Sequence, residues 1–208
     1  MIVCLALFFS GCRADAPPPF TLIEVLQRED FSESYIWQNY VSPEQKVDFQ
    51  IVNNVYRALA WDGGFVWVLN RTIHTDVVIE IETAQLSTFR DNAYGILCRA
   101  APTDNGNGYY FLISGDGHYT IRRGAADEID ALIPWTATSA IRPNQAINRM
   151  RAVCIGDYLA LYINGEFIAE THDSRYLRGY AGLAAGVVAD GDLEVTFDDL
   201  TIWAASIP

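Results

Sequence analysis

The chain has 208 residues, of which 50% are hydrophobic and 12% aromatic, and its formal net charge is −12. This length and apolar content suit one globular domain with a sizeable core. An acidic surface of this kind repels phosphate backbones, which argues against nucleic acid as a partner. Solubility is the simplest explanation of the charge, which by itself indicates no cationic ligand.

The N-terminal residues have the pattern of an export signal. Residues 2–9, IVCLALFF, form an apolar run too short to span a bilayer. The sequence FSGC, from Phe9 to Cys12, begins at the last residue of this run and resembles the lipobox of bacterial lipoproteins. We therefore expect a signal peptide over residues 1–11, a lipidated Cys12, and a Pro-rich tether over residues 12–19. An ordinary cleaved signal and an unprocessed apolar tail are the alternatives. The lipoprotein interpretation predicts an extracytoplasmic protein, lipid-anchored to a bacterial membrane in the cell envelope.

From residue 20 onward the sequence has the pattern of an all-β domain with little helix. Short apolar runs alternate with turn residues, and no stretch shows sustained helical periodicity. We expect strands within residues 22–31, 47–61, 63–70, 75–86, 92–101, 108–114, 118–123, 149–155, 158–163, 166–172, 179–188 and 193–203. Many strands at close spacing, without crossover helices, predict an antiparallel sandwich.

Three turns predict hairpins within this pattern. Asn53-Asn54 divides one long run into two strands, and Asn164-Gly165 is typical of a two-residue type I′ turn. Gly115-Asp116-Gly117 suits a three-residue loop. The strand before that loop places Tyr109, Phe111 and Ile113 on one face, and Tyr110, Leu112 and Ser114 on the other. One of these two sets must belong to the core.

Two of the four cysteines, Cys98 and Cys154, remain after Cys4 in the signal and Cys12 at the anchor are set aside. Both lie in apolar, strand-like runs. In an exported protein we expect them to form a disulfide. The alternative is a pair of buried free thiols. Two isolated cysteines are too few to form a metal site.

Several segments together resemble the concanavalin A-like lectin/glucanase sandwich. They include AYGILCRA, NGYYFLISGDGHYTI, YINGEFIAE, GYAGLAAG and LEVTFDDLTIW. The chain is most similar to the laminin-G-like and keto-glycoside-hydrolase-like domains of bacterial surface proteins. The resemblance implies a two-sheet antiparallel jelly roll over residues 20–208. It also implies a concave sheet, with ligands bound on that face or at its rim loops.

This resemblance makes carbohydrate the expected ligand, because the family includes lectins, glycan-binding and adhesion modules, and glycosidases. Aromatic rings stack on sugar faces while polar side chains bind the hydroxyls. The candidate ligand-binding residues are Arg99, Asp104, Asn107, Tyr110 and Trp135. The expected function is non-catalytic glycan binding. One alternative is a glycoside hydrolase of the same fold, and another is a structural or adhesion module that binds a protein partner.

No catalytic residues can be assigned from the sequence. Glycosidases of this fold need two carboxylates, and laminarinase-type enzymes carry Glu, Asp and Glu at alternate positions of one strand. Here Glu80 and Glu82 are followed by Ala84, and we expect both glutamates to be solvated. Calcium is the one cofactor to consider, with Asp190 and Asp192 as candidate ligands in a segment that also suits a simple turn.

Overall fold

The computed structural model describes residues 17–32, 36–37, 39–126 and 128–208. The predicted signal peptide, Cys12 and the first part of the predicted tether lie outside these residues. The described residues form fifteen strands and no helix. They therefore contain no helix that could cross a membrane. The strands are β1 (Thr21–Glu29), β2 (Tyr40–Ser42), β3 (Val47–Val52), β4 (Val55–Trp61), β5 (Phe65–His74), β6 (Val77–Gln85), β7 (Asn92–Ala100), β8 (Gly108–Ile113), β9 (His118–Ala125), β10 (Glu128–Ala137), β11 (Asn148–Ile155), β12 (Tyr158–Ile163), β13 (Glu166–His172), β14 (Gly179–Val187) and β15 (Asp192–Ser206).

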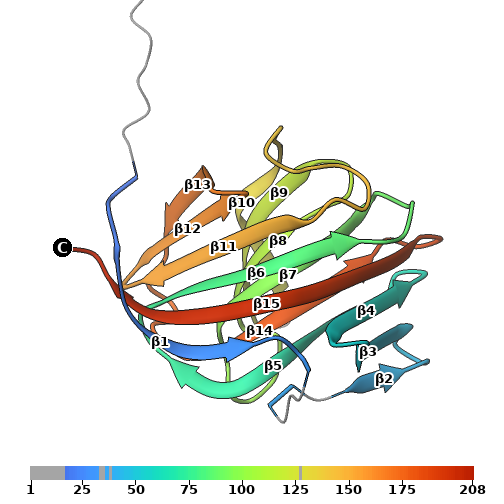
Figure 1. The fold of residues 1–208 in the computed structure, drawn as a ribbon, viewed down its shortest axis with the longest axis horizontal. Coiled ribbons are helices and arrows are strands. Elements are labelled where there is room, and N and C mark those ends of the chain that lie inside the picture. The colour runs from blue at the N-terminus through green and yellow to red at the C-terminus, as the bar shows by residue number, and fades with distance from the viewer. Residues whose placement is uncertain (1–16, 33–35, 38, 127) are drawn as a thin grey trace, which may run out of the picture.

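The strands form two antiparallel sheets stacked as a sandwich, which confirms the predicted jelly-roll class (Figure 1). The nine-stranded sheet has the order β13-β12-β11-β6-β15-β4-β3-β2, with β1 also paired to β15. The long strand β15 pairs with β4 along its first half and with β1 along its second half. The six-stranded sheet has the order β10-β9-β8-β7-β14-β5.

The core lies between the two sheets and follows the alternation of the strands. Tyr109, Phe111 and Ile113 of β8 point into it, whereas Tyr110 and Leu112 belong to a separate apolar cluster on the outer face of the six-stranded sheet. The two predicted faces of this strand are therefore confirmed. Alternation also places one row of each inner strand outside the core, where it can form a ligand surface.

The predicted disulfide between Cys98 and Cys154 is present in the structure. Cys98 lies on β7 of one sheet and Cys154 on β11 of the other, with their Cα atoms 6.8 Å apart. The bond therefore joins the two layers of the sandwich covalently, at a point where both residues are buried.

The predicted hairpins are present. Asn53 and Asn54 have φ values of 53° and 63°, and Asn164 has a φ of 54°, as type I′ turns require. In the third hairpin β8 ends at Ile113 and β9 begins at His118, so Ser114 belongs to the connection. The loop is therefore one residue longer than predicted, and Ser114 Oγ hydrogen-bonds within it to Asp116.

The sequence predicts that Glu80 and Glu82 are solvated, but in the structure both are partly buried. Both lie on the outer face of β6, opposite Arg151 and Arg149 of β11. Arg151 Nη2 lies 2.6 Å from Glu80 Oε2, and Arg149 forms an ion pair with Glu82. Cross-strand pairing of opposite charges explains why these glutamates are partly buried on that face.

Candidate functional site

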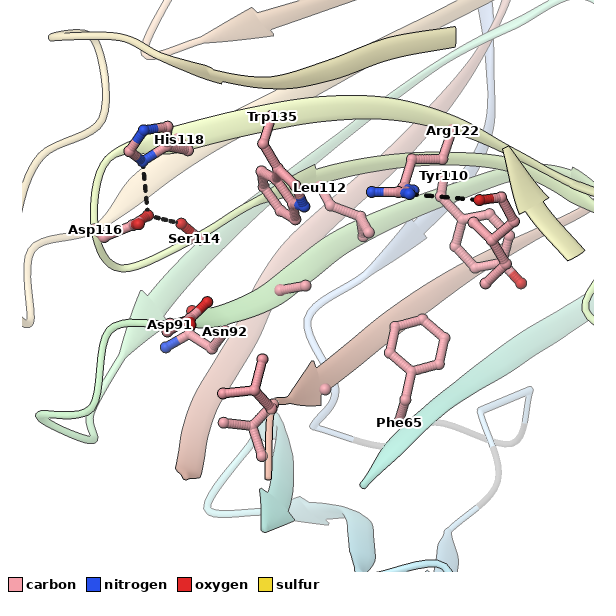
Figure 2. Close-up of a pocket in the computed structure, with 15 residues that line it drawn as sticks. Phe65, Asp91, Asn92, Tyr110, Leu112, Ser114, Asp116, His118, Arg122 and Trp135 are labelled. Atoms are coloured by element: carbon pink, nitrogen blue, oxygen red, sulfur yellow. Dashed lines mark hydrogen bonds and ion pairs between the residues drawn. The ribbon is translucent and has the colours of Figure 1, made fainter. Parts of the chain in front are cut away.

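A groove of about 570 Å³ lies on the outer face of the six-stranded sheet (Figure 2). Such a volume is within the range of small-ligand sites. Three aromatic residues contribute to its walls, Phe65 of β5, Tyr110 of β8 and Trp135 of β10. The polar residues that line it are Asp91, Asn92, Ser114, Asp116, His118 and Arg122.

The groove exists because the central strands of this sheet carry small outward-facing residues. Ala93 of β7 and Gly186 of β14 line the groove between the taller side chains of β5 and β8. A Cβ atom at Gly186 would lie 2.3 Å from Cδ2 of Phe65. With no side chain in the way, the rings of Phe65 and Tyr110 approach to 6.2 Å between centroids, although β7 and β14 separate their strands.

One end of the groove is formed by the β8–β9 hairpin and the start of β7. Asp116 accepts a hydrogen bond from Ser114 Oγ, and its Oδ1 lies 3.0 Å from His118 Nδ1. Burial alone would raise the pKa of Asp116, but its contacts with Ser114 and His118 outweigh it and hold the pKa below its ordinary value. Asn92 fixes the hairpin, because its Oδ1 accepts from the Gly115 amide at 3.0 Å.

The other end of the groove is aromatic and carries a guanidinium. Arg122 of β9 is partly buried, and its Nη2 lies 3.4 Å from the Ile129 carbonyl oxygen. Trp135 comes from β10, an edge strand whose pairing with β9 shifts register before and after Ile133. Such irregularities re-aim side chains, and the Trp135 ring, 40% exposed, lines the groove between the two ends (Figure 2).

The structure brings two of the five predicted ligand-binding residues into this groove. Tyr110 and Trp135 both line it. Tyr110 is fully buried, and its hydroxyl donates to the Gly106 carbonyl oxygen at 2.8 Å. Burial raises the pKa of Tyr110 well above its ordinary value, so the hydroxyl stays protonated as a donor.

Asp104 and Asn107 lie beside the groove, in the β7–β8 loop. Asp104 lines a neighbouring cavity of about 380 Å³ that shares Phe65 with the groove, and it accepts a hydrogen bond from Trp67 Nε1 at 2.8 Å. Asn107 Oδ1 accepts from the Ala126 amide at 3.0 Å. Both side chains therefore hold the loop and the neighbouring hairpin in place.

Arg99, the fifth predicted residue, is separated from the groove. Only 1% of its surface is exposed, and its guanidinium donates five hydrogen bonds to other parts of the chain. In this arrangement it has no donor directed toward a ligand on the outer face. Its role in the structure is to connect loops through these hydrogen bonds.

None of the six polar residues that line the groove is among the ligand-binding residues predicted from the sequence. A signal for two of them was present in β9, where His118, Thr120 and Arg122 alternate with core residues and must therefore share the outer face. Asn92 and Phe65 come from other strands and Asp91 from the connection before β7, and their convergence depends on the order of strands in the sheet.

The predicted calcium ligands lie in a turn at the start of β15. Asp190 and Asp192 are both exposed, and the turn closes through a hydrogen bond from the Gly191 amide to the Val188 carbonyl oxygen at 3.2 Å. Within the part of the chain that the structure describes, no three His, Cys, Asp or Glu side chains gather to hold a metal ion. Calcium binding at this turn stays a prediction.

Comparisons with known proteins show the fold. No family model matches the chain, and no curated protein matches it either. The carbohydrate binding module CBM66 from Bacillus subtilis is similar in structure, with a TM-score of 0.66 and 17% identity over 81% of this chain and 95% of that one. A protein of unknown function with a galectin-like fold, also from Bacillus subtilis, has a TM-score of 0.66 and 14% identity over 90% of this chain and 99% of that one.

An enzyme is among the similar structures as well. The GlcNAcα1-4Gal-releasing endo-β-galactosidase from Clostridium perfringens has a TM-score of 0.62 and 8% identity, over 86% of this chain and 62% of that one. Binding modules and glycosidases thus share this jelly-roll sandwich, and the fold alone does not decide between them.

Proposed function

We propose that the groove of the six-stranded sheet binds carbohydrate and that the protein is a non-catalytic glycan-binding domain. The observation that carries the proposal is the partly exposed Trp135 in a groove lined by hydrogen-bonding side chains. An indole offers a flat surface for the apolar face of a sugar ring. Asp91, Asn92 and Asp116 offer carboxylate and amide groups to hydroxyls. The similarity to a carbohydrate binding module supports the same ligand class.

A hydrolase of the same fold is the second candidate, because the groove holds two carboxylates, Asp91 and Asp116. A glycosidase needs a general acid whose pKa is raised so that it is protonated near neutral pH. The pKa of Asp116 is instead lowered, on balance, by Ser114 and His118. Asp116 is therefore poorly suited to act as that general acid.

The test is a glycan array probed with the detergent-solubilised full chain, with and without calcium, followed by titration calorimetry on the hits. We expect Trp135→Ala to abolish binding. Trp61→Ala is the matched control, because Trp61 is similarly exposed, at 37%, but lies at the end of β4 in the other sheet. Absence of binding to any glycan would overturn the proposal and favour a protein partner. Turnover of a polysaccharide that is lost in Asp91→Asn or Asp116→Asn would show a hydrolase.

We also propose that the domain is held outside the cytoplasm by a lipid on Cys12. The apolar run before Cys12 supports this, and so does the disulfide, since such bonds persist in oxidising compartments. Metabolic labelling with a radioactive fatty acid tests the proposal. Label should appear in the wild-type protein and be absent from Cys12→Ser, and equal labelling of both would contradict it.

A further inference from the structure

We infer that the groove selects an acidic glycan, with a sugar carboxylate bound at Arg122. This inference rests on the proposed function and adds the ligand class and its orientation. It follows from the distribution of charge along the groove, from the hydrogen bonds of Arg122, and from the position of Trp135 between the two ends.

Arg122 differs from its neighbour Arg123 in what it contacts. Arg123 Nη1 lies 2.6 Å from Asp173 Oδ2 and its Nη2 lies 2.9 Å from Asp130 Oδ2, so its charge is matched within the protein. Among the described residues Arg122 has no carboxylate partner, and its one hydrogen bond is the 3.4 Å contact to the Ile129 carbonyl oxygen. A partly buried guanidinium that lines a groove in this way retains free donors for a planar carboxylate.

The two acidic side chains that line the groove, Asp91 and Asp116, lie at the opposite end. Asp116 belongs to the hairpin before His118, and Arg122 follows His118 by four positions along β9, a distance of about 13 Å along a strand. Asp91 lies at the same end as Asp116 (Figure 2). Carboxylates accept hydrogen bonds from neutral hydroxyls and repel anions. The groove therefore favours a ligand with hydroxyls at the hairpin end and negative charge at the Arg122 end.

The length of the groove suits a short oligosaccharide that lies along it. Trp135 lies between the two ends and would stack on a ring while the acid group of that ring, or of the next, reaches Arg122 (Figure 2). The whole protein carries a net charge of −12, which disfavours anionic ligands at long range. An acidic glycan is therefore favoured only where a guanidinium is close, and this makes the binding specific to the site.

The experiment compares acidic sugars with neutral counterparts by titration calorimetry on the full chain. The probes are trigalacturonic acid with its methyl ester, and sialyllactose with lactose. We expect the acidic member of at least one pair to bind about tenfold more tightly, the difference that one charge-assisted hydrogen bond supplies. High ionic strength should reduce this preference.

Substitutions separate the inference from the proposed function. Arg122→Gln should remove the preference, so that the acid and its neutral counterpart bind with similar affinity, while Arg122→Lys should keep part of the preference. Arg28→Gln, which removes an exposed charge from β1 of the other sheet, is the control and should behave like wild type. Thermal unfolding checks that each variant is folded.

Two results would overturn the inference, and they differ in what they leave standing. If glycans bind in a manner lost in Trp135→Ala but without preference for the acid, the inference is wrong and the proposed function stands. If no glycan binds, acidic or neutral, both are wrong.

Discussion

The buried Arg99 of β7 forms an ion pair with the partly exposed Asp76, which lies in the turn between β5 and β6, with Nη2 and Oδ1 3.1 Å apart. The same guanidinium donates to four backbone carbonyl oxygens, those of Thr75, Cys154, Gly156 and Tyr176. These acceptors belong to the β5–β6 turn, the end of β11, the β11–β12 turn and the segment before β14. One side chain thus fixes connections from both sheets at one end of the sandwich.

Arg99→Met should therefore destabilise the fold strongly. The substitution removes every donor and leaves buried acceptors unpaired, for which we expect a loss of about 3 kcal/mol in the free energy of unfolding. Arg99→Lys should also destabilise, because three donors cannot replace five hydrogen bonds. Urea denaturation followed by tryptophan fluorescence measures the change. Arg178→Met, at an exposed arginine, is the control, and equal stability of the Arg99 and Arg178 variants would contradict the prediction.

The fold could be predicted where local pattern and final environment agree. In β8 strict alternation separates Tyr109 from Tyr110, and the structure places one in the core and the other outside. The type I′ turn at Asn164 is equally local, because it depends on φ values that few residues adopt. The sequence does not predict the strand β10, because its local pattern and its final environment do not agree. It is an exposed edge strand that contains Pro134 and shifts register, so its sequence lacks alternation.

The site could be predicted only in part, because it depends on contacts between distant segments. Tyr110 and Trp135 were identifiable as aromatic residues near a sheet surface. Phe65 lies far from both in the sequence, and it reaches Tyr110 only because Gly186 leaves space between them. The local sequence around Arg99 predicts an exposed side chain, because the hydrogen-bond acceptors that bury it come from distant loops of both sheets.

The disulfide between Cys98 and Cys154 should contribute measurably to stability. Its cysteines are 56 residues apart, and closing a loop of that length in the unfolded chain stabilises the native state by about 4 kcal/mol in the chain-entropy treatment. The double variant Cys98→Ala/Cys154→Ala should therefore unfold at lower urea concentration. Reductant should shift the wild-type midpoint and leave the variant unchanged. Two more reactive thiols in the denatured, unreduced wild-type protein than in the double variant would show that the bond does not form.

Asp173 should make stability depend on pH in the acid range. Burial alone would raise its pKa, but hydrogen bonds from the Tyr109 hydroxyl, the Arg175 amide and the Arg123 guanidinium hold the pKa below its ordinary value. A carboxyl whose folded pKa is depressed stabilises the fold above its unfolded pKa, near 4, and this contribution is lost as the pH falls through the folded value.

The variant Asp173→Asn tests this linkage. It should be less stable than wild type by about 1 kcal/mol or more at pH 7, and the gap should narrow below about pH 4, as the carboxyl is protonated first in the unfolded and then in the folded protein. Urea denaturation at a series of pH values measures both the stability difference at pH 7 and its decrease in acid. Asp157→Asn is the control at a more exposed carboxyl of the neighbouring β11–β12 turn. A gap that stays constant down to pH 2 would contradict the sign of the effect.

Filling the floor of the groove should abolish ligand binding without unfolding the domain. Ala93 faces outward from β7 and lines the groove, while its neighbour Tyr94 points into the core. Leu at position 93 would extend from β7 into the groove beside Gly186, so a sugar could no longer approach the sheet there. Because the added methyl groups extend into an open groove, the free energy of unfolding should change by less than about 1 kcal/mol.

Ala84→Leu, at a partly exposed site on the outer face of β6 in the other sheet, adds the same volume away from the groove and should bind like wild type. Titration of both variants with a glycan that the wild type binds, together with thermal unfolding, completes the test. Undiminished binding by Ala93→Leu would place the ligand elsewhere on the molecule, whereas loss in both variants would trace the effect to general destabilisation of the sandwich.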